Sequence, residues 1–199
     1  MKKRLIHLSK SEKTKKMILE KAAELFSQKG YSAVTMKDVC EATGLSRGGL
    51  YRHFGSTGEM LGLIIIEEQR NADIKLRKCL DEGRSALQIL DALIEAHTSF
   101  LLSPRSALEL AANQYALLDP VGKIINKERA FSTVKRTAQI IRFGQEKGVF
   151  IDGDPVSIAW YIVFFLSGIH TQKPLFELED DFICTQINYI RDFLLKKKE

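Results

Sequence analysis

The spacing of apolar and polar residues along the 199-residue chain predicts a protein made almost entirely of helices. Between residues 11 and 29, apolar side chains recur every three or four positions and share one helical face: Ile18, Ala22, Leu25 and Phe26. Valine-rich alternating stretches, glycine-rich linkers and internal repeats are absent from the sequence. The pattern therefore indicates an all-α fold with about nine helices and no strand.

Capping signals divide this pattern into separate helices. Gly30 is placed to end the first helix in a left-handed conformation, and Thr35 with Asp38 begins a second helix. Gly44 separates that helix from a third, which Ser46 can cap and which we expect over residues 47–53. Later starts follow from serine or aspartate caps and from prolines at first helical positions: Ser56 with Glu59, Ser85 with Gln88, Ser103 with Pro104, Asp119 with Pro120, and Asp154 with Pro155.

Two short predicted helices within residues 35–54 (TMKDVCEATGLSRGGLYRHF) carry the candidate chemistry. Joined by a tight turn at Gly44, they fit a helix-turn-helix, a motif whose second helix enters the major groove of DNA. Arg47 suits a guanine edge or a phosphate, and Tyr51 and His53 can donate hydrogen bonds to phosphate oxygens. This segment therefore predicts DNA recognition.

Other residues of the segment support the same interpretation. Gly48 and Gly49 each disfavour a helix by about 1 kcal/mol relative to alanine, which is explained if the backbone approaches DNA closely. The hydroxyl of Ser46 can reach a phosphate or a base. Thr35 and Lys37 lie at the start of the first of the two helices, where free N–H groups favour a phosphate.

Charge is distributed unevenly along the chain. Residues 1–56 hold 12 Lys and Arg against 5 Asp and Glu, whereas residues 57–199 hold 18 against 20. The basic excess is therefore confined to the part that contains the helix-turn-helix, as expected of a module that meets a polyanion.

The N-terminal region also resembles that of tetracycline-repressor (TetR) family regulators. The resemblance covers about residues 13–61 and is carried by AAELFSQKGYSAVTMKDVCEATGLSRGGLYRHFGSTGEML. It implies a DNA-binding domain over residues 1–56 and a helical effector-binding and dimerisation domain over residues 57–199. It further implies that residues at or near the DNA include Thr35, Ser46, Arg47, Gly48, Gly49, Tyr51 and His53. Thr57 stands where the family usually has a phosphate-contacting lysine, so we expect a different backbone contact there.

The C-terminal helices predict a contact between subunits. Residues 158–169 are apolar nearly all round, and the last helix, about residues 179–195, is apolar on two sides. One side can pack on the chain's own domain and the other on a second copy, as in a four-helix bundle, and the resemblance implies the same homodimer. The sequence leaves open which face forms the contact: the candidates are Ile162, Phe165, Gly168, Ile169, Ile183, Ile187, Ile190 and Leu194, and the second face holds Phe182, Tyr189 and Phe193.

An effector pocket in the central helices is suggested by the resemblance. Small-molecule pockets are mostly apolar with a few polar groups, and the same mixture is typical of ordinary core. The candidate lining residues are His97, Phe100, Asn113, Gln114, Tyr115, Phe131, Trp160 and Phe164.

Catalysis, metal binding and membrane insertion are not indicated. The sequence has no HExxH, P-loop or GxSxG motif, and Cys40, Cys79 and Cys184 form no ligand pair, so we expect no catalytic residue, cofactor or metal. The N-terminus lacks a signal-peptide pattern, and no apolar run reaches the roughly 20 residues of a membrane span. We therefore expect a cytoplasmic protein.

The leading hypothesis is a homodimeric repressor that a small apolar or aromatic effector releases from a palindromic operator in double-stranded DNA. An activator is equally compatible with the sequence. The alternative is a regulator without a small-molecule effector, either constitutive or redox-responsive through Cys40.

Overall fold

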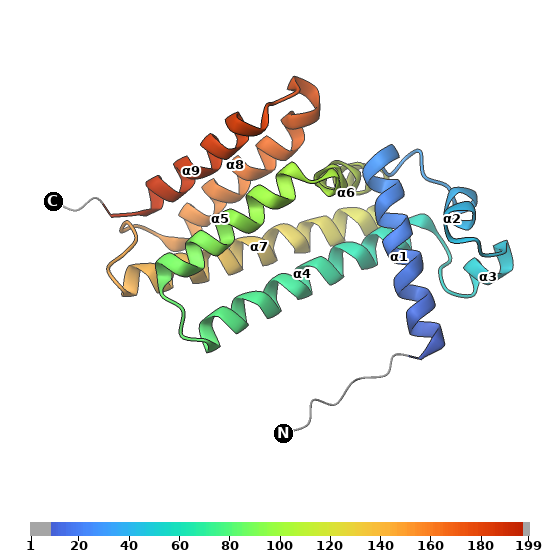
Figure 1. Cartoon of the computed structure of the whole chain (residues 1–199), viewed down its shortest axis with the longest axis horizontal. Coiled ribbons are helices and arrows are strands. Elements are labelled where there is room, and N and C mark those ends of the chain that lie inside the picture. The colour runs from blue at the N-terminus through green and yellow to red at the C-terminus, as the bar shows by residue number, and fades with distance from the viewer. Residues whose placement is uncertain (1–8, 197–199) are drawn as a thin grey trace.

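The computed structural model describes residues 9–196, with α-helices throughout and no strand among them (Figure 1). The all-α prediction is confirmed. The helices are α1 (Lys10–Lys29), α2 (Met36–Thr43), α3 (Arg47–Tyr51), α4 (Thr57–Asp81), α5 (Ala86–Leu102), the 3-10 helix η1 (Pro104–Ala107), α6 (Leu108–Leu118), α7 (Pro120–Glu146), α8 (Pro155–Phe176) and α9 (Asp180–Leu194). The single extended pairing in these residues is a bridge between Phe150 and Leu195.

The caps read from the sequence define most of these boundaries. Thr35 and Asp38 form a reciprocal capping box at α2, and Gly44 ends α2 in the left-handed conformation, at φ 69° and ψ 13°. Ser46 caps α3, but α3 ends at Tyr51 instead of continuing to residue 53. Gly30 also has a positive φ of 75°, yet its ψ of 171° lies outside the left-handed helical region.

Two apolar cores hold the helices together. The first lies under α1, α2 and α3 and takes in the first turns of α4 and one side of α6, with Phe26, Leu50 and Leu61 fully buried. The second lies between α5, α7, α8 and α9, with Phe150 and Ile183 fully buried. Since α4 contributes to the first core and its far end packs on the second, it connects the two parts of the chain (Figure 1).

The domain boundary proposed at residues 56–57 falls just before α4. Ser56 caps this helix by accepting a hydrogen bond from the Glu59 N–H at 3.1 Å. The Glu59 carboxylate accepts from the Gly55 N–H at 2.7 Å, so the expected reciprocal box does not form. Within residues 9–196, no helix is long and apolar enough to cross a membrane.

Candidate functional site

The α2–α3 pair projects from one end of the molecule (Figure 1). Val39, Leu50 and Phe54 are buried beneath it and fix the two helices to α1 and α4. Because the apolar side of α3 is fully used in this packing, its opposite side is free to face a partner. That side presents Arg47, Gly48 and Tyr51.

Arg47 and Tyr51 lie together on the exposed side of α3. The Arg47 guanidinium carbon is 5.6 Å from the centre of the Tyr51 ring, a cation–π arrangement that holds both side chains on one surface. Tyr51 is 44% exposed although it is aromatic. The pair offers a guanidinium and a phenol hydroxyl to a ligand that approaches α3 from outside.

The two glycines of α3 have different environments. Gly48 is exposed, and a Cβ added there would meet no atom within 4 Å. Gly49 is buried, and a Cβ added there would lie 3.2 Å from Oγ of Ser46. The sequence-based expectation that both glycines expose backbone is therefore corrected: Gly48 does so, whereas Gly49 makes room for the cap of α3.

The start of α2 is held by a small polar network. The Thr35 hydroxyl donates to Asp38, whose carboxylate also accepts from Nζ of Lys29 at 2.6 Å. The hydrogen bond from Lys29, with those from Thr35, holds the pKa of Asp38 well below its usual range. Thr35 and Lys37 are exposed beside this network, and Lys37 pairs weakly with Glu41 at 3.7 Å.

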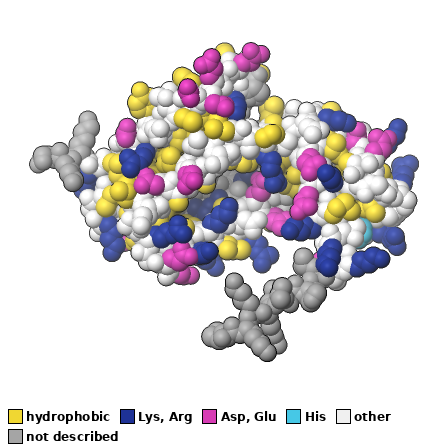
Figure 2. All heavy atoms as spheres, viewed as in Figure 1, with side chains coloured by type: hydrophobic (Ala, Val, Ile, Leu, Met, Phe, Trp, Pro, Cys, Tyr) yellow, Lys and Arg dark blue, Asp and Glu magenta, His cyan; other side chains and the backbone are white. Residues whose placement is uncertain are grey.

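The remaining candidate DNA contacts lie around this surface. Ser46 is exposed, whereas His53 and Thr57 are half-buried. Figure 2 shows Lys and Arg side chains gathered over the end of the molecule that carries α2 and α3. The structure thus brings the predicted residues to one basic surface, with Gly49 as the exception.

The candidate effector residues do not form one pocket. Tyr115 lies in the first core and packs on Tyr31 after the end of α1, and the half-buried Gln114 accepts a hydrogen bond from the Tyr31 N–H. Phe131, Trp160 and Phe164 form an aromatic group on the outside of α7 and α8, in which the Phe131 ring meets Trp160 edge-on and the Phe164 ring is tilted against it. Phe131 and Phe164 are at least half exposed. Of the other candidates, Phe100 packs on His170, Asn113 accepts a hydrogen bond from Asn126 at 3.4 Å, and His97 is half-buried on α5.

The centre of the body contains partly buried charged groups. Arg129 donates two hydrogen bonds to Glu109, at 2.5 and 2.7 Å, and their side chains are 18% and 14% exposed. Two turns of α7 further on, Arg136 donates to Asp73 at 3.0 Å and to Gln69 at 2.6 Å. These pairs join α7 to α6 on one side and to α4 on the other.

Two histidines face the same region. Burial lowers the pKa of His97 to about 4 and also lowers the pKa of His170, so both imidazoles are neutral near pH 7. The His170 ring centre is 5.4 Å from that of Phe100. Nδ1 of His170 and Oδ1 of Asn126 are buried with no hydrogen-bond partner in the described part of the chain.

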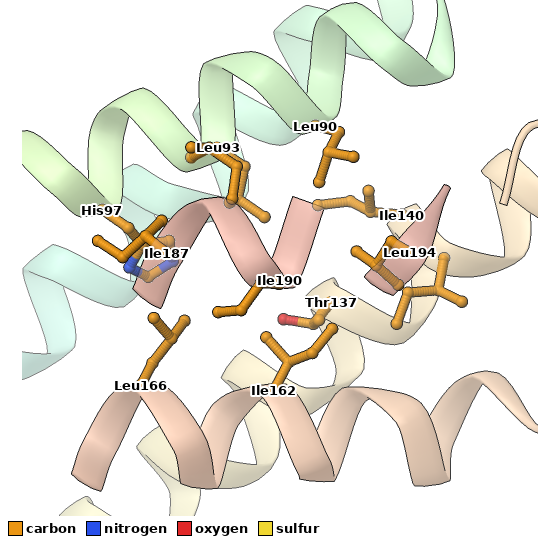
Figure 3. A pocket seen from close by; sticks show the side chains of 12 residues that line it. Leu90, Leu93, His97, Thr137, Ile140, Ile162, Leu166, Ile187, Ile190 and Leu194 are labelled. Atoms are coloured by element: carbon orange, nitrogen blue, oxygen red, sulfur yellow. The ribbon is translucent and has the colours of Figure 1, made fainter. Parts of the chain in front are cut away.

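A small apolar cavity lies next to His97 (Figure 3). It is lined by residues of α5, α7, α8 and α9, among them Leu166, Ile187 and Ile190. Its volume of about 20 Å³ is close to the space of one water molecule. His97 therefore separates an apolar cavity from the polar centre.

The subunit-contact candidates divide between the two faces of α8 and α9. Ile162, Ile169, Ile183, Ile187, Ile190 and Leu194 are buried in the protomer's own core, so they offer no surface to a second copy. Only Phe165, which is half-buried, and Gly168, which is exposed, lie on the outside. The exposed aromatic side chains of α8 and α9 include Tyr161, Phe164, Phe182, Tyr189 and Phe193.

Sequence reasoning missed the charged centre of the body. Its members lie far apart in the sequence, and no local motif joins them. They come from four helices: Glu68 from α4, Glu109 from α6, Arg129 from α7 and His170 from α8. The available signal was weak: Glu109 is the one charged residue of α6. Charged side chains in such positions are seldom buried unless paired.

An exposed α3 on a basic surface, held by a short support helix, defines a helix-turn-helix DNA-binding protein. The family model of bacterial regulatory proteins, tetR family, matches residues 18–64. The chain is 32% identical over 168 residues to YfiR of Bacillus subtilis (strain 168), an uncharacterized HTH-type transcriptional regulator. The matched region covers 80% of this chain and 79% of YfiR. It is 25% identical over 142 residues to the HTH-type transcriptional regulator UidR of Escherichia coli (strain K12), 70% of each chain.

A solved structure has the same architecture. A protein from Saccharomonospora viridis, in complex with choline, matches with a TM-score of 0.80 and 22% identity over 93% of this chain and 99% of that one. The chain thus belongs to the TetR family and is a DNA-binding transcriptional regulator, not an enzyme. The resemblance inferred from the helix-turn-helix is confirmed.

Proposed function

We propose that the chain acts in the cytoplasm as a homodimeric repressor that binds a palindromic operator through α3 and is released by a small molecule bound in the helical body. The observation that carries the DNA-binding part is the exposed side of α3, where Arg47 and Tyr51 flank the open backbone at Gly48. In this arrangement Arg47 contacts a base edge or phosphate, and Tyr51 donates to a phosphate oxygen.

The homodimer is supported by the aromatic face of α8 and α9. Tyr161, Phe164, Tyr189 and Phe193 are each between 44% and 66% exposed, and the Tyr161 and Phe193 rings pack 5.4 Å apart. Several large exposed aromatic side chains on neighbouring helices are typical of an interface. Two copies joined there would present two α3 helices to successive half-sites of an operator.

Effector release is supported by the position of α6. One side of this helix carries Glu109 in the charged centre, and the other carries Gln114, which binds the Tyr31 backbone N–H next to the DNA-binding helices. A ligand that shifts α6 would therefore shift the support of α1. By linkage, operator DNA must weaken ligand binding by the same factor. The choline bound to the Saccharomonospora protein is consistent with a small-molecule site in this architecture.

Selection of bound genomic fragments with the full chain tests the DNA-binding part. Arg47→Ala should weaken binding to the selected operator by about 1–3 kcal/mol, and the matched control Arg84→Ala, on the turn after α4, should not. Equal loss on unrelated DNA would place Arg47 on phosphate. Failure to enrich any fragment would contradict operator binding.

A regulator without an effector is the second candidate, and the small size of the cavity beside His97 favours it. The two candidates differ in the response of the operator complex to small molecules. The redox form of this alternative predicts that oxidant abolishes DNA binding in the parent but not in Cys40→Ser.

A further inference from the structure

We infer that Lys29, the last residue of α1, contacts a DNA phosphate at the start of α2, where its ammonium group lies against Asp38. Neither the helix-turn-helix motif nor the exposed side of α3 singled out Lys29, because it belongs to the preceding helix. Thr35, a candidate DNA contact, then has a different role, since its hydroxyl holds Asp38. This inference rests on the DNA-binding part of the proposed function.

The Thr35 hydroxyl is already engaged within the protein. It donates its hydrogen to the Asp38 carboxylate and accepts a hydrogen bond from the Asp38 backbone N–H at 3.2 Å. The same carboxylate accepts from the Thr35 backbone N–H at 2.8 Å. A hydroxyl has one hydrogen to donate, so Thr35 cannot donate to a phosphate without releasing Asp38. A phosphate contact at this point therefore needs another donor.

The ammonium group of Lys29 has donors left for a ligand. Its Nζ donates to Oδ1 of Asp38 at 2.6 Å, and an ammonium carries three N–H donors. The Lys29 side chain makes no other hydrogen bond or ion pair within residues 9–196. It is 45% exposed, whereas the Asp38 side chain is 22% exposed, so a ligand from outside reaches the ammonium more easily than the carboxylate.

Asp38 also keeps the Lys29 ammonium in one position. Hydrogen bonds from Lys29 and Thr35 hold the pKa of Asp38 well below its usual range, so the carboxylate stays ionised near pH 7. Lys37 differs in this respect, because its side chain is 85% exposed and lies 3.7 Å from Glu41. A side chain that is already ordered loses less conformational entropy on binding a phosphate.

The location of this ion pair favours a phosphate as its ligand. When the second helix of a helix-turn-helix lies in the major groove, the first helix crosses the phosphate backbone. Here α3 is the second helix, and α2 begins beside the Lys29 ammonium. Lys and Arg side chains gather over this end of the molecule (Figure 2). A phosphate that passes the start of α2 would therefore meet Lys29.

The alternative is a purely internal role, in which Lys29 neutralises Asp38 and joins α1 to α2 without touching DNA. The two roles differ in their dependence on salt and on Asp38. A lysine that binds a phosphate releases about one counterion from DNA, which steepens the salt dependence of binding. A lysine that only neutralises Asp38 becomes dispensable once Asp38 is replaced by a neutral residue.

Fluorescence-anisotropy titration of the full chain at several salt concentrations tests the contact. The probes are two labelled duplexes, the selected operator and a mixed-sequence duplex of the same length. Lys29→Met should weaken binding to both by about 5- to 10-fold at about 0.15 M salt. It should also reduce the slope of log affinity against log salt by about one per bound chain. Lys29→Arg should keep the slope of the parent, because it keeps the charge.

Lys196→Met is the matched control. Lys196 pairs with Asp152 at 2.9 Å and its side chain is 40% exposed, but it lies near the C-terminus, at the opposite end of the molecule from α2 and α3 (Figure 1). Affinity and salt slope should stay at the parent's values. Thermal unfolding shows whether each variant folds. If Lys29→Met does not, Lys29→Gln takes its place, because glutamine keeps an N–H donor for Asp38 without the charge.

Asp38→Asn separates the phosphate contact from neutralisation. The asparagine oxygen can still accept from the Thr35 N–H, whereas the negative charge is gone. We expect Lys29→Met to reduce affinity and salt slope in the Asp38→Asn background as well. Recovery of the parent's affinity in this double variant, an unchanged salt slope in Lys29→Met, or a loss confined to the operator would each overturn the inference.

The two duplexes keep this inference apart from the proposed repressor. If genomic selection yields no operator, the mixed-sequence duplex still tests Lys29, because phosphate contacts do not depend on base sequence. A loss on that duplex then supports the Lys29 contact while operator recognition fails. Parent-like binding of Lys29→Met to both duplexes overturns the Lys29 contact and leaves operator binding standing. A parent chain that binds neither duplex overturns both.

Discussion

The side-chain oxygen of Gln114 accepts a hydrogen bond from the backbone N–H of Tyr31, with 2.8 Å between oxygen and nitrogen. The two residues are 83 positions apart in the sequence, and the bond fastens the end of α1 to α6. The next residue, Tyr115, packs its ring 4.7 Å from that of Tyr31. This junction joins α6 of the helical body to the end of α1, next to the DNA-binding helices.

Loss of the Gln114 bond should loosen the junction. Gln114→Leu leaves the partly buried Tyr31 N–H without an acceptor, so we expect the free energy of unfolding to fall by about 1–3 kcal/mol. Urea unfolding followed by circular dichroism measures this loss. Gln28→Leu, an exposed position on α1, provides the control and should change stability by less than about 0.5 kcal/mol. A similar loss in both variants would show that the bond contributes nothing specific.

Replacement of Gly48 by alanine should change stability and DNA binding in opposite directions. A methyl group added there meets nothing within 4 Å, and alanine favours a helix, so Gly48→Ala should stabilise the protein by up to about 1 kcal/mol. If DNA approaches the backbone at this point, the same methyl should weaken operator binding by about 1 kcal/mol or more. Thermal unfolding and gel-shift titration measure the two effects. An unchanged operator affinity would remove Gly48 from the DNA contact.

Local signals were enough to predict the helices and the helix-turn-helix. The Thr35–Asp38 box, the turn at Gly44 and the cap at Ser46 act over three or four residues, and each forms as the sequence indicates. The end of α3 was misplaced because no cap residue marks it. Fold class and motif are therefore encoded in short-range patterns that a single sequence displays.

Long-range pairings were not predictable from the same patterns. Glu109 finds Arg129 only because α6 packs on α7, and His97 and His170 come from helices far apart in the sequence. The sequence also did not show which face of α9 is buried in the core, since both faces are apolar. Only packing shows that Ile183 and Ile187 are in the core while Tyr189 is outside.

Breaking the Glu109–Arg129 pair should be strongly destabilising. Arg129→Met leaves the Glu109 carboxylate buried and unpaired, and we expect a loss of about 3–5 kcal/mol. The double variant Glu109→Met, Arg129→Met should recover much of that loss, because no isolated charge remains. Lys16→Ala, which removes an exposed ion pair with Glu20, serves as the control and should cost less than about 1 kcal/mol. A double variant as unstable as the single one would contradict this account.

His97 should make stability depend on pH. Burial depresses its pKa from 6.5 to about 4, so the unfolded chain binds more protons than the folded chain between these values. Stability contributed by neutral His97 is therefore present above pH 6.5 and is lost as pH falls towards 4, by about 3 kcal/mol in total.

His97→Leu should remove this dependence. The stability difference between parent and variant, measured by urea unfolding at pH 7 and pH 5, isolates the contribution of His97. This difference is informative because His170, Glu68 and Glu109 titrate in both proteins. A difference that does not change with pH would show that His97 is protonated equally in folded and unfolded chains.

The aromatic face of α8 and α9 should hold the dimer together. Tyr189 is 61% exposed in the protomer, and in a subunit contact it would be covered. Tyr189→Glu would then bury a charge at the interface and weaken association by about 2 kcal/mol or more. Sedimentation equilibrium measures the association constant directly.

Ile74→Glu provides the matched control, because Ile74 is 53% exposed on α4, away from α8 and α9. We expect the parent and Ile74→Glu to sediment as dimers and Tyr189→Glu to shift towards the monomer. Operator affinity should fall in parallel in Tyr189→Glu, because one α3 helix contacts a single half-site. A fully dimeric Tyr189→Glu would exclude Tyr189 from the contact and direct attention to Phe131 on α7, which also exposes aromatic surface.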